Sequence, residues 1–111
     1  MFGFGGDKHK EISASELKAM LANGEALLVD VREVDEFADG HIAGAINMPL
    51  SQFQPSRIPD AGGKTVVLQC AGGKRSAMAL DKCASAQAAI ETHLAGGIGA
   101  WKSAGFPVVR G

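Results

Sequence analysis

Apolar residues along this chain follow two patterns, continuous runs of strand length and positions that share one face of a helix. Continuous runs occupy residues 26–29 and 65–68, and the second is rich in β-branched residues, which favour strands. Because neither run alternates with polar residues, each predicts a strand that is buried on both faces, as in a parallel sheet. Residues 90–94 and 108–109 predict a further strand and a terminal extended segment.

The helical pattern is most complete after Ser13. Ser13 and Glu16 have the spacing of a capping box, the apolar residues that follow share one helical face, and the pair Asn23 and Gly24 ends the segment. Residues 76–89 are rich in alanine, which favours a helix and allows its close approach to a sheet. Shorter helical segments are predicted around residues 34–38, 51–57 and 98–104.

Strands and helices that alternate at this spacing predict an α/β fold with right-handed crossovers. A chain of 111 residues allows one compact domain. We assign it to residues 12–111, with residues 1–11 as a mobile N-terminal extension. Ligands of such folds bind beyond the carboxyl ends of the strands. Asp30 and Cys70 lie at the ends of the two apolar runs, so the functional site is expected there.

Composition and charge argue against nucleic acids and membranes as binding partners. The chain has 11 basic and 12 acidic side chains and a formal net charge of −1, so it lacks the positive surface that binds nucleic acids and anionic membranes. No apolar run approaches the roughly 18 residues of a membrane span, and the start of the chain lacks the apolar stretch of a signal peptide. We therefore expect a cytoplasmic protein that binds neither nucleic acid nor membrane.

Cysteine and histidine counts exclude two further kinds of site. Two cysteines cannot make a disulfide framework, which favours a reducing compartment. His9, His41 and His93 are scattered without the spacing of metal ligands, so no metal site is expected.

The segment over residues 70–76 carries the most specific chemistry. It leads from the end of a buried strand into a helix, and its two adjacent glycines permit left-handed dihedral angles, so successive N–H groups can form an anion-binding nest. A helix N-terminus and nearby cations lower the pKa of a thiol. Cys70 is therefore a candidate thiolate nucleophile. The residues expected to form its binding loop are Ala71, Gly72, Gly73, Lys74, Arg75 and Ser76.

Two other interpretations of this segment compete with a nucleophilic Cys70. Cys70 can be a small residue that merely ends a strand, because free cysteine is often only buried. A nucleotide-binding P-loop needs a glycine five positions before the Gly-Lys pair and Ser or Thr directly after the lysine. The chain has Leu68 and Arg75 at those positions, so the P-loop is set aside.

Cys70, Gly73, Arg75 and Ser76 match the pattern Cys-x-x-Gly-x-Arg-Ser. In this, the loop resembles the active-site loop of single-domain rhodanese-like sulfurtransferases. Further stretches resemble other motifs of that family in the same order. These are an Asp-x-Arg motif with its glutamate at residues 30–36, a glycine-flanked signature at 40–49, and the end of the domain at 96–108.

The resemblance implies a rhodanese-like α/β fold, with a mostly parallel five-stranded sheet flanked by helices and the cysteine loop at its carboxyl edge. It also implies that the Cys70 thiolate takes a sulfane sulfur from thiosulfate or another persulfide donor and carries it as a persulfide. The sulfur then passes to cyanide or to a thiol acceptor, which can belong to a partner protein. No metal or organic cofactor is required.

Two alternatives compete with sulfur transfer. The main one is a noncatalytic rhodanese-like module for binding or regulation, although inactive modules usually lack the cysteine that is present here. A more distant one is phosphatase or arsenate reductase activity. The related enzymes with those activities have one more loop residue and an arginine six positions after the cysteine, where this chain has Ser76.

The resemblance also assigns roles to residues around the loop. Arg75 is expected to close the loop and add positive field, with an ordinary surface ion pair as the alternative. Arg32 either meets the incoming anion or, with Asp30, braces the loop. Glu36 is expected to brace rather than to act as an acid. His41 is expected to make a structural hydrogen bond, since a persulfide cycle through a thiolate needs no general base.

Four more positions bear on activity. Some two-domain family enzymes hold thiosulfate with a cation two residues after the cysteine, where this chain has Gly72, and Lys74 is a candidate substitute. Trp101 is expected to anchor the last helix by packing, with a partner surface as the alternative. Cys83 is expected to pack in the alanine-rich helix, with a resolving thiol as the alternative.

Overall fold

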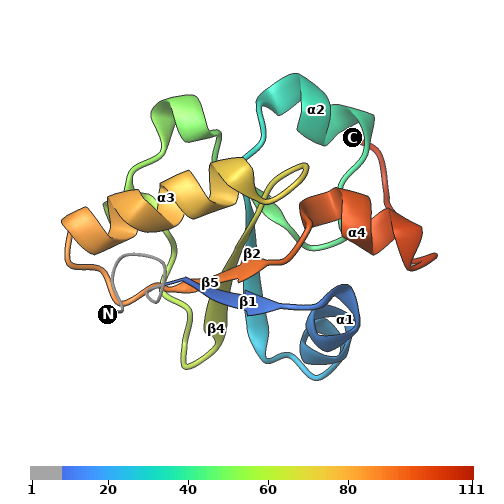
Figure 1. Cartoon of the computed structure of the whole chain (residues 1–111), viewed down its shortest axis with the longest axis horizontal. Helices are drawn as coiled ribbons and strands as arrows, with labels where there is room; N and C mark the ends of the chain where they lie inside the picture. Colours follow the sequence, from blue (N-terminus) through green and yellow to red (C-terminus); the bar gives the residue numbers. More distant parts are fainter. Residues whose placement is uncertain (1–8) are drawn as a thin grey trace, which may run out of the picture.

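The computed structural model describes residues 9–111, which form a five-stranded sheet with strand order β1-β5-β4-β2-β3 (Figure 1). All neighbouring strands are parallel. The strands are β1 (Lys10–Ile12), β2 (Ala26–Asp30), β3 (Ile46–Asn47), β4 (Thr65–Gln69) and β5 (Thr92–Leu94). The parallel five-stranded sheet that the resemblance implied is therefore confirmed.

Helices connect these strands, as the alternating pattern predicted. They are α1 (Ala14–Ala22), α2 (Val34–Asp39), α3 (Lys74–Ser85) and α4 (Gly97–Ser103), with short 3-10 helices at Leu50–Gln52 and Pro55–Arg57. The predicted capping box begins α1. The Glu16 N–H donates to Ser13 Oγ at 3.0 Å, and the Ser13 N–H donates to Glu16 Oε1 at 2.8 Å.

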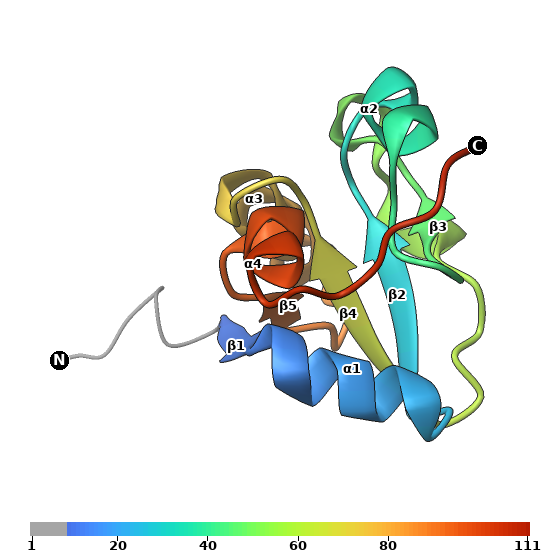
Figure 2. The ribbon, with the colours of Figure 1, turned by 90° about the vertical axis from the view of Figure 1, so that its right-hand side faces the viewer.

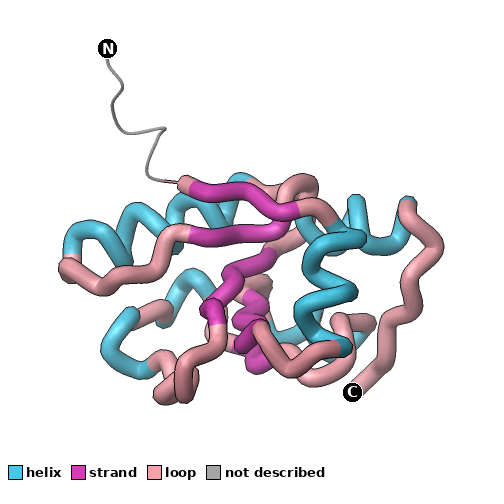
Figure 3. The backbone as a smooth tube through the Cα atoms, turned by 90° about the horizontal axis from the view of Figure 1, so that it is seen from below, coloured by secondary structure: helices cyan, strands magenta, loops and turns pink. Residues whose placement is uncertain are grey.

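Both faces of the sheet are covered, because alternate residues of the central strands pack on opposite sides. Leu28 and Val67 join one core cluster with residues of α1 and α4, whereas Val29 and Leu68 join a second cluster with residues of α3. Figure 3 shows the strands with helices on either side. The continuous apolar runs thus mark strands buried on both faces, as predicted.

The carboxyl ends of β2 and β4 lie side by side, because Asp30 and Gln69 are register partners. The chain leaves β4 through Cys70 and enters the loop before α3. The C-terminal segment runs past this edge of the sheet toward α2 (Figure 2), where His41 and Val109 form an antiparallel bridge. The fold therefore brings Asp30 and Cys70 to one edge of the sheet, where the functional site was expected.

Several boundaries differ from those predicted from the sequence. The sheet includes residues 10 and 11, which were assigned to the extension, while residues 1–8 lie outside the described residues. The short strands β1 and β3 have no counterpart among the predicted elements. Helix α3 spans Lys74–Ser85 rather than 76–89, because Gln87 is left-handed with φ of 60° and cannot continue a right-handed helix.

Within residues 9–111, no helix is long and apolar enough to cross a membrane. The same residues include no group of three or more His, Cys, Asp or Glu side chains placed to hold a metal ion.

Candidate active site

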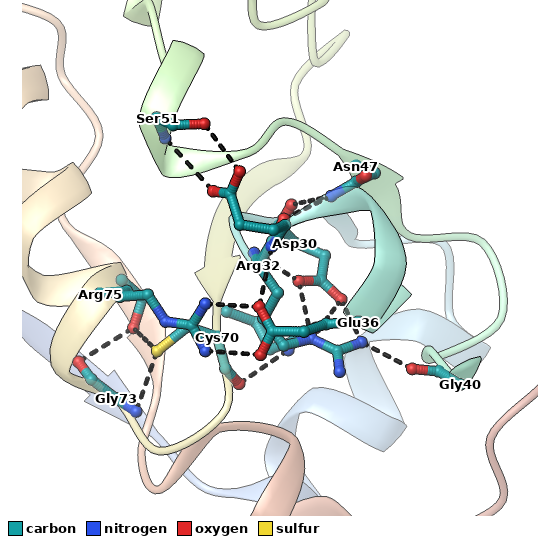
Figure 4. A network of polar contacts seen from close by, with 12 residues as sticks. Asp30, Arg32, Glu36, Gly40, Asn47, Ser51, Cys70, Gly73 and Arg75 are labelled. Atoms are coloured by element: carbon teal, nitrogen blue, oxygen red, sulfur yellow. Dashed lines mark hydrogen bonds and ion pairs between the residues drawn. The ribbon is translucent and has the colours of Figure 1, made fainter. Parts of the chain in front are cut away.

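The loop after β4 folds around the sulfur of Cys70, which is 1% exposed. The backbone N–H of Gly73 donates to Cys70 Sγ at 3.0 Å (Figure 4). Gly73 has φ of 109°, a left-handed conformation that glycine adopts without strain, and it immediately precedes α3. Of the two adjacent glycines, therefore, only Gly73 adopts the left-handed conformation expected of the loop, and Gly72 does not.

Burial is the largest single influence on the pKa of Cys70 and by itself would raise it, since a thiolate is costly in apolar surroundings. Hydrogen bonds from the Ser76 hydroxyl and from the N–H groups of Ser76, Gly73 and Gly72 act in the opposite direction. Together they hold the pKa of Cys70 below its ordinary value. The direction expected from the sequence agrees with the structure, and the leading causes that lower the pKa are the hydrogen-bond donors at the start of α3, with the charge of Arg75 interacting with Cys70 more weakly.

Ser76 is fully buried beside the sulfur. Its Oγ lies 3.6 Å from Cys70 Sγ, 3.1 Å from the Gly73 carbonyl oxygen and 2.8 Å from Nδ1 of His93. The sequence places Ser76 in the loop but shows no sign of its contact with His93, because that contact depends on how β5 lies beside α3. His93 is thus a residue of the site that the spacing of motifs did not indicate.

Arg75 fastens the loop to α2 through Glu36. The two guanidinium nitrogens Nη1 and Nη2 donate to Oε1 and Oε2 of Glu36 at 2.6 and 2.9 Å (Figure 4). This pairing is the main reason that the pKa of Glu36 falls to about 2. Glu36 therefore has the geometry of the expected brace, and its carboxylate offsets part of the positive field that Arg75 was expected to add.

Asp30 and Arg32 form a buried ion pair at the end of β2. Arg32 Nε and Nη2 donate to the Asp30 carboxylate at 2.9–3.2 Å, and Nη2 also donates to the Gly40 carbonyl oxygen at 2.6 Å. Arg32 is 6% exposed and Asp30 fully buried. Of the two roles considered for Arg32, the contacts support bracing, because Asp30 and Gly40 already engage these donors.

His41 makes the kind of contacts expected of a structural residue. Its Nδ1 lies 2.9 Å from the Phe37 carbonyl oxygen, and its ring stacks on the Phe37 ring with 3.7 Å between centroids. Its backbone pairs with Val109 near the end of the chain. These contacts join α2 to the C-terminal segment.

Cys83 and Trp101 both pack in the interior. Cys83 is fully buried on α3, and burial raises the pKa of its thiol. Trp101 is 4% exposed, its Nε1 donates to the Pro107 carbonyl oxygen at 2.8 Å, and its ring meets Phe106 edge to face. The surroundings of both residues support the packing roles that were expected.

Helix α4 holds the Cys70 loop through its backbone. The Ile98 N–H donates to the Cys70 carbonyl oxygen at 2.8 Å, and the Gly99 N–H donates to the Ala71 carbonyl oxygen at 3.1 Å. A Cβ atom on Gly97 would collide with the backbone of Cys70 and Ala71, so only glycine permits this approach. Gly97 of this motif, which the sequence assigns to the end of the domain, therefore lies directly against the loop.

Comparisons with known proteins agree with this geometry. The family model for the Rhodanese-like domain matches residues 13–104. An uncharacterized protein of Synechocystis sp. is 43% identical over 99 residues, 89% of this chain and 55% of that protein, so the chain spans about half the length of this relative. A sulfurtransferase of Allochromatium vinosum is 36% identical over 102 residues, 89% of this chain and 94% of that protein.

Among solved structures, a thiosulfate sulfurtransferase from Pseudomonas aeruginosa matches with a TM-score of 0.81 and 26% identity. The match covers 95% of this chain and 21% of that one. A rhodanese-related protein from Thermoplasma volcanium matches with a TM-score of 0.77 and 30% identity, over 91% of this chain and 98% of that one. These likenesses confirm the fold that the sequence motifs implied.

Proposed function

Because this chain belongs to the rhodanese-like domain family, we propose that it is a sulfurtransferase in which Cys70 carries the transferred sulfur. The observation that carries the proposal is the donation of the Gly73 N–H to Cys70 Sγ at 3.0 Å, in a loop that holds the pKa of Cys70 below its ordinary value. The thiolate is the nucleophilic form of cysteine. Similarity to the Allochromatium sulfurtransferase supports the same class of reaction.

In the first half-reaction, the Cys70 thiolate attacks the outer sulfur of thiosulfate or the terminal sulfur of another persulfide donor. A new S–S bond forms at Cys70, the bond to the inner sulfur of the donor breaks, and its electron pair leaves with sulfite or with the donor thiolate. In the second half-reaction, cyanide or a thiolate acceptor attacks the terminal sulfur of the Cys70 persulfide. The Cys70 thiolate then returns, and neither half-reaction needs an external oxidant or reductant.

The loop suits this cycle because negative charge moves only between neighbouring sulfur atoms. Donors fixed by the backbone do not have to reorganise when charge shifts, so they can stabilise the thiolate and the persulfide in turn. Lys74, the first residue of α3, is exposed and is our candidate for contact with an anionic donor such as thiosulfate. Arg32 and Arg75 act in this account as supports of the loop, through Asp30 and Glu36.

The intact mass of the protein tests the proposal. Thiosulfate should add the mass of one sulfur atom to the wild type and to Cys83→Ser, and cyanide should remove it and yield thiocyanate. Cys70→Ser should gain no sulfur and form no thiocyanate. An adduct or turnover in Cys70→Ser would place the nucleophile elsewhere. A folded wild-type protein that gains no sulfur from thiosulfate or polysulfide would favour the noncatalytic module instead.

A further inference from the structure

A chain of polar side chains connects the buried sulfur of Cys70 with the protein surface. Cys70 Sγ lies 3.6 Å from Ser76 Oγ, which lies 2.8 Å from Nδ1 of His93, and Nε2 of His93 lies 3.4 Å from Oε2 of Glu11. Ser76 is fully buried and His93 is 4% exposed, whereas the Glu11 side chain is 61% exposed. This series of polar side chains therefore leads from a buried thiol to a solvated carboxylate.

The sheet register brings these residues together. His93 of β5 is the register partner of Leu68 in β4, whose side chain packs in the core cluster beneath α3. His93 is also the register partner of Glu11 in β1. The ring of His93 thus lies between Glu11 on the neighbouring strand and Ser76 in the first turn of α3.

A single hydroxyl proton links the protonation of Cys70 to that of His93. Ser76 has one proton to donate and three neighbours that can accept it: Cys70 Sγ, His93 Nδ1 and the Gly73 carbonyl oxygen. When Nδ1 of His93 lacks a proton, it can accept the hydroxyl proton, and Ser76 then accepts from the thiol. When Nδ1 carries a proton, it donates to Ser76, whose hydroxyl is free to donate to a Cys70 thiolate.

We propose that Ser76 and His93 form a proton relay for Cys70, in which His93 is a positioning residue whose Nδ1 gains a proton when Cys70 becomes a thiolate. The S–H bond of Cys70 breaks and an O–H bond forms on Ser76, while the former hydroxyl proton of Ser76 passes to Nδ1. The Nε2 proton of His93 then passes to Glu11 or water. One proton leaves the protein, and His93 remains neutral with its proton on Nδ1. The relay rests on the proposed role of Cys70 in sulfur transfer.

The groups around His93 keep it neutral before the relay acts. Burial lowers the pKa of His93, Glu11 raises it, and His9 lowers it. The net effect is a pKa below the ordinary value, so the ring is an imidazole that can accept one proton and release another near neutral pH. His9 meets the ring edge to face with 5.9 Å between centroids, and its own Nε2 lies 2.9 Å from Asp81.

Two charged groups near Cys70, Arg75 and Asp30, are already paired. Arg75 is bound by Glu36, and that hydrogen bond is the largest cause of its raised pKa. The charges of Cys70 and Asp30 raise the pKa of Arg75 by smaller amounts. Asp30 is bound by Arg32. Both of these charged groups are thus held in ion pairs, whereas Nδ1 of His93 contacts the Ser76 hydroxyl that lies beside the sulfur.

The decisive experiment follows both ring nitrogens of His93 by 15N NMR while the pH is raised through the titration of Cys70. The relay predicts that Nδ1 moves toward the shift of a protonated ring nitrogen, and Nε2 away from it, at the pH where Cys70 ionises. The rate of Cys70 alkylation gives that pH independently. This change in the two nitrogen shifts should be absent in Cys70→Ala and Ser76→Ala. The ring signals that are missing from the spectrum of His93→Asn identify the resonances of His93.

Two substitutions of His93 separate the relay from simple packing. His93→Leu removes the donor to Ser76, so alkylation of Cys70 at neutral pH should slow by roughly two- to tenfold, the usual effect of a lost neutral hydrogen bond. His93→Asn keeps an N–H donor in the place of Nδ1 and should restore the rate to within about twofold, as expected when that bond is re-formed. Neither variant can accept the thiol proton, so this pair tests the final state of the relay, in which an N–H in the place of Nδ1 donates to Ser76. Equal loss in both variants would show that this donor does not stabilise the thiolate and would overturn the relay.

The NMR outcome is independent of the sulfurtransferase assay. Identical His93 shifts in the wild type and in Cys70→Ala at every pH would overturn the relay, even in a protein that transfers sulfur. A His93 step in a protein that takes no sulfur from thiosulfate or polysulfide would support the relay and overturn only the proposed function.

Discussion

Cys70 and Cys83 lie in the same apolar cluster and are 1% and 0% exposed, yet their thiols differ in acidity. Burial raises the pKa of Cys83. Burial acts on Cys70 in the same direction, but the Ser76 hydroxyl and the N–H groups of the loop hold the pKa of Cys70 below its ordinary value. Donors that face the sulfur, rather than exposure to solvent, therefore distinguish the candidate nucleophile from the packing cysteine.

The difference follows from where each cysteine lies relative to α3. Cys70 precedes the helix, where the first N–H groups have no partners within the helix and can bind an anionic sulfur. Cys83 lies near the other end of the same helix, where N–H groups already bond to earlier carbonyl oxygens. One helix thus provides a polar environment at its start and an apolar one along its buried face.

Gly73→Ala is expected to have the largest effect on the reactivity that distinguishes Cys70 from Cys83. Alanine at φ of 109° is strained, so the loop should relax and move the Gly73 N–H away from the Cys70 sulfur. Loss of a preorganised donor of this kind lowers turnover by roughly a hundredfold or more. Thiosulfate turnover and the pH dependence of Cys70 alkylation would measure the loss.

Gly72→Ala is the matched control. Gly72 has no left-handed φ, a Cβ atom there would meet nothing within 4 Å, and alanine keeps the backbone N–H. Its turnover should stay within about threefold of the wild type, the scale of a surface change of roughly 0.5 kcal/mol. Equal losses in the two variants would show that the left-handed glycine is not what prepares Cys70.

Arg75→Ala should have the next largest effect. It removes both hydrogen bonds to Glu36 and releases the loop from α2. A charge-assisted hydrogen bond contributes about 1.5–3 kcal/mol, so sulfur transfer should fall by roughly ten- to a hundredfold. Alkylation of Cys70 should also shift to higher pH.

Lys74→Ala is the control for Arg75→Ala, because it removes a positive charge from the loop without breaking the ion pair with Glu36. Lys74 is an exposed cation of the same loop, whereas the leading causes that lower the pKa of Cys70 are hydrogen bonds from Ser76, Gly73 and Gly72. We expect Lys74→Ala to raise the KM for thiosulfate while leaving the alkylation profile unchanged. A Lys74→Ala profile shifted as far as that of Arg75→Ala would mean that loop charge, rather than the ion pair with Glu36, prepares the sulfur.

A smaller effect concerns stability in acid. The pKa of Glu36 is about 2 in the folded protein and lies near its ordinary value of about 4.3 in the unfolded chain, so the unfolded chain takes up the proton first as pH falls. The contribution of Glu36 to stability is therefore complete above its ordinary pKa and is lost as pH falls toward 2. Urea unfolding should show Glu36→Gln less stable than the wild type at about pH 6, with the difference shrinking steadily below about pH 4. A difference that is constant with pH would contradict the ion pair.

The smallest effect is expected from Cys83→Ala. Cys83 packs among apolar side chains and its thiol has a raised pKa, so it is not prepared to attack a persulfide. Turnover with thiosulfate and a thiol acceptor should stay within about twofold, since packing changes of this size act on stability rather than on the site. A variant that gains sulfur on Cys70 but cannot pass it to thiols would instead identify Cys83 as a resolving thiol.

The sequence predicted well those features that depend on neighbouring residues. The runs at 26–29 and 65–68 indicated the buried strands, and the spacing of Ser13 and Glu16 indicated the start of α1. The position of Cys70 between a strand and a glycine loop indicated the candidate site. Each of these depends on local periodicity, capping or backbone freedom, which a sequence shows directly.

Features that depend on tertiary contacts could not be predicted in the same way. Strands β1 and β3 are three and two residues long, too short for a hydrophobic period, and they form because neighbouring strands pair with them. The contact between Ser76 and His93 depends on the position of β5 beside α3. The pairing of Arg75 with Glu36 joins residues 39 positions apart, so no local pattern marks it.

The most direct test of the account is the alkylation rate of each cysteine against pH, with Cys83→Ala reporting on Cys70 and Cys70→Ala reporting on Cys83. The account predicts that Cys70 reaches half of its maximal rate below the pH of an ordinary thiol, and Cys83 above it, although both are buried. The same Cys83→Ala protein should gain one sulfur from thiosulfate, and this gain should follow the Cys70 profile. Profiles that coincide for the two cysteines would contradict the claim that the loop prepares Cys70 as a thiolate.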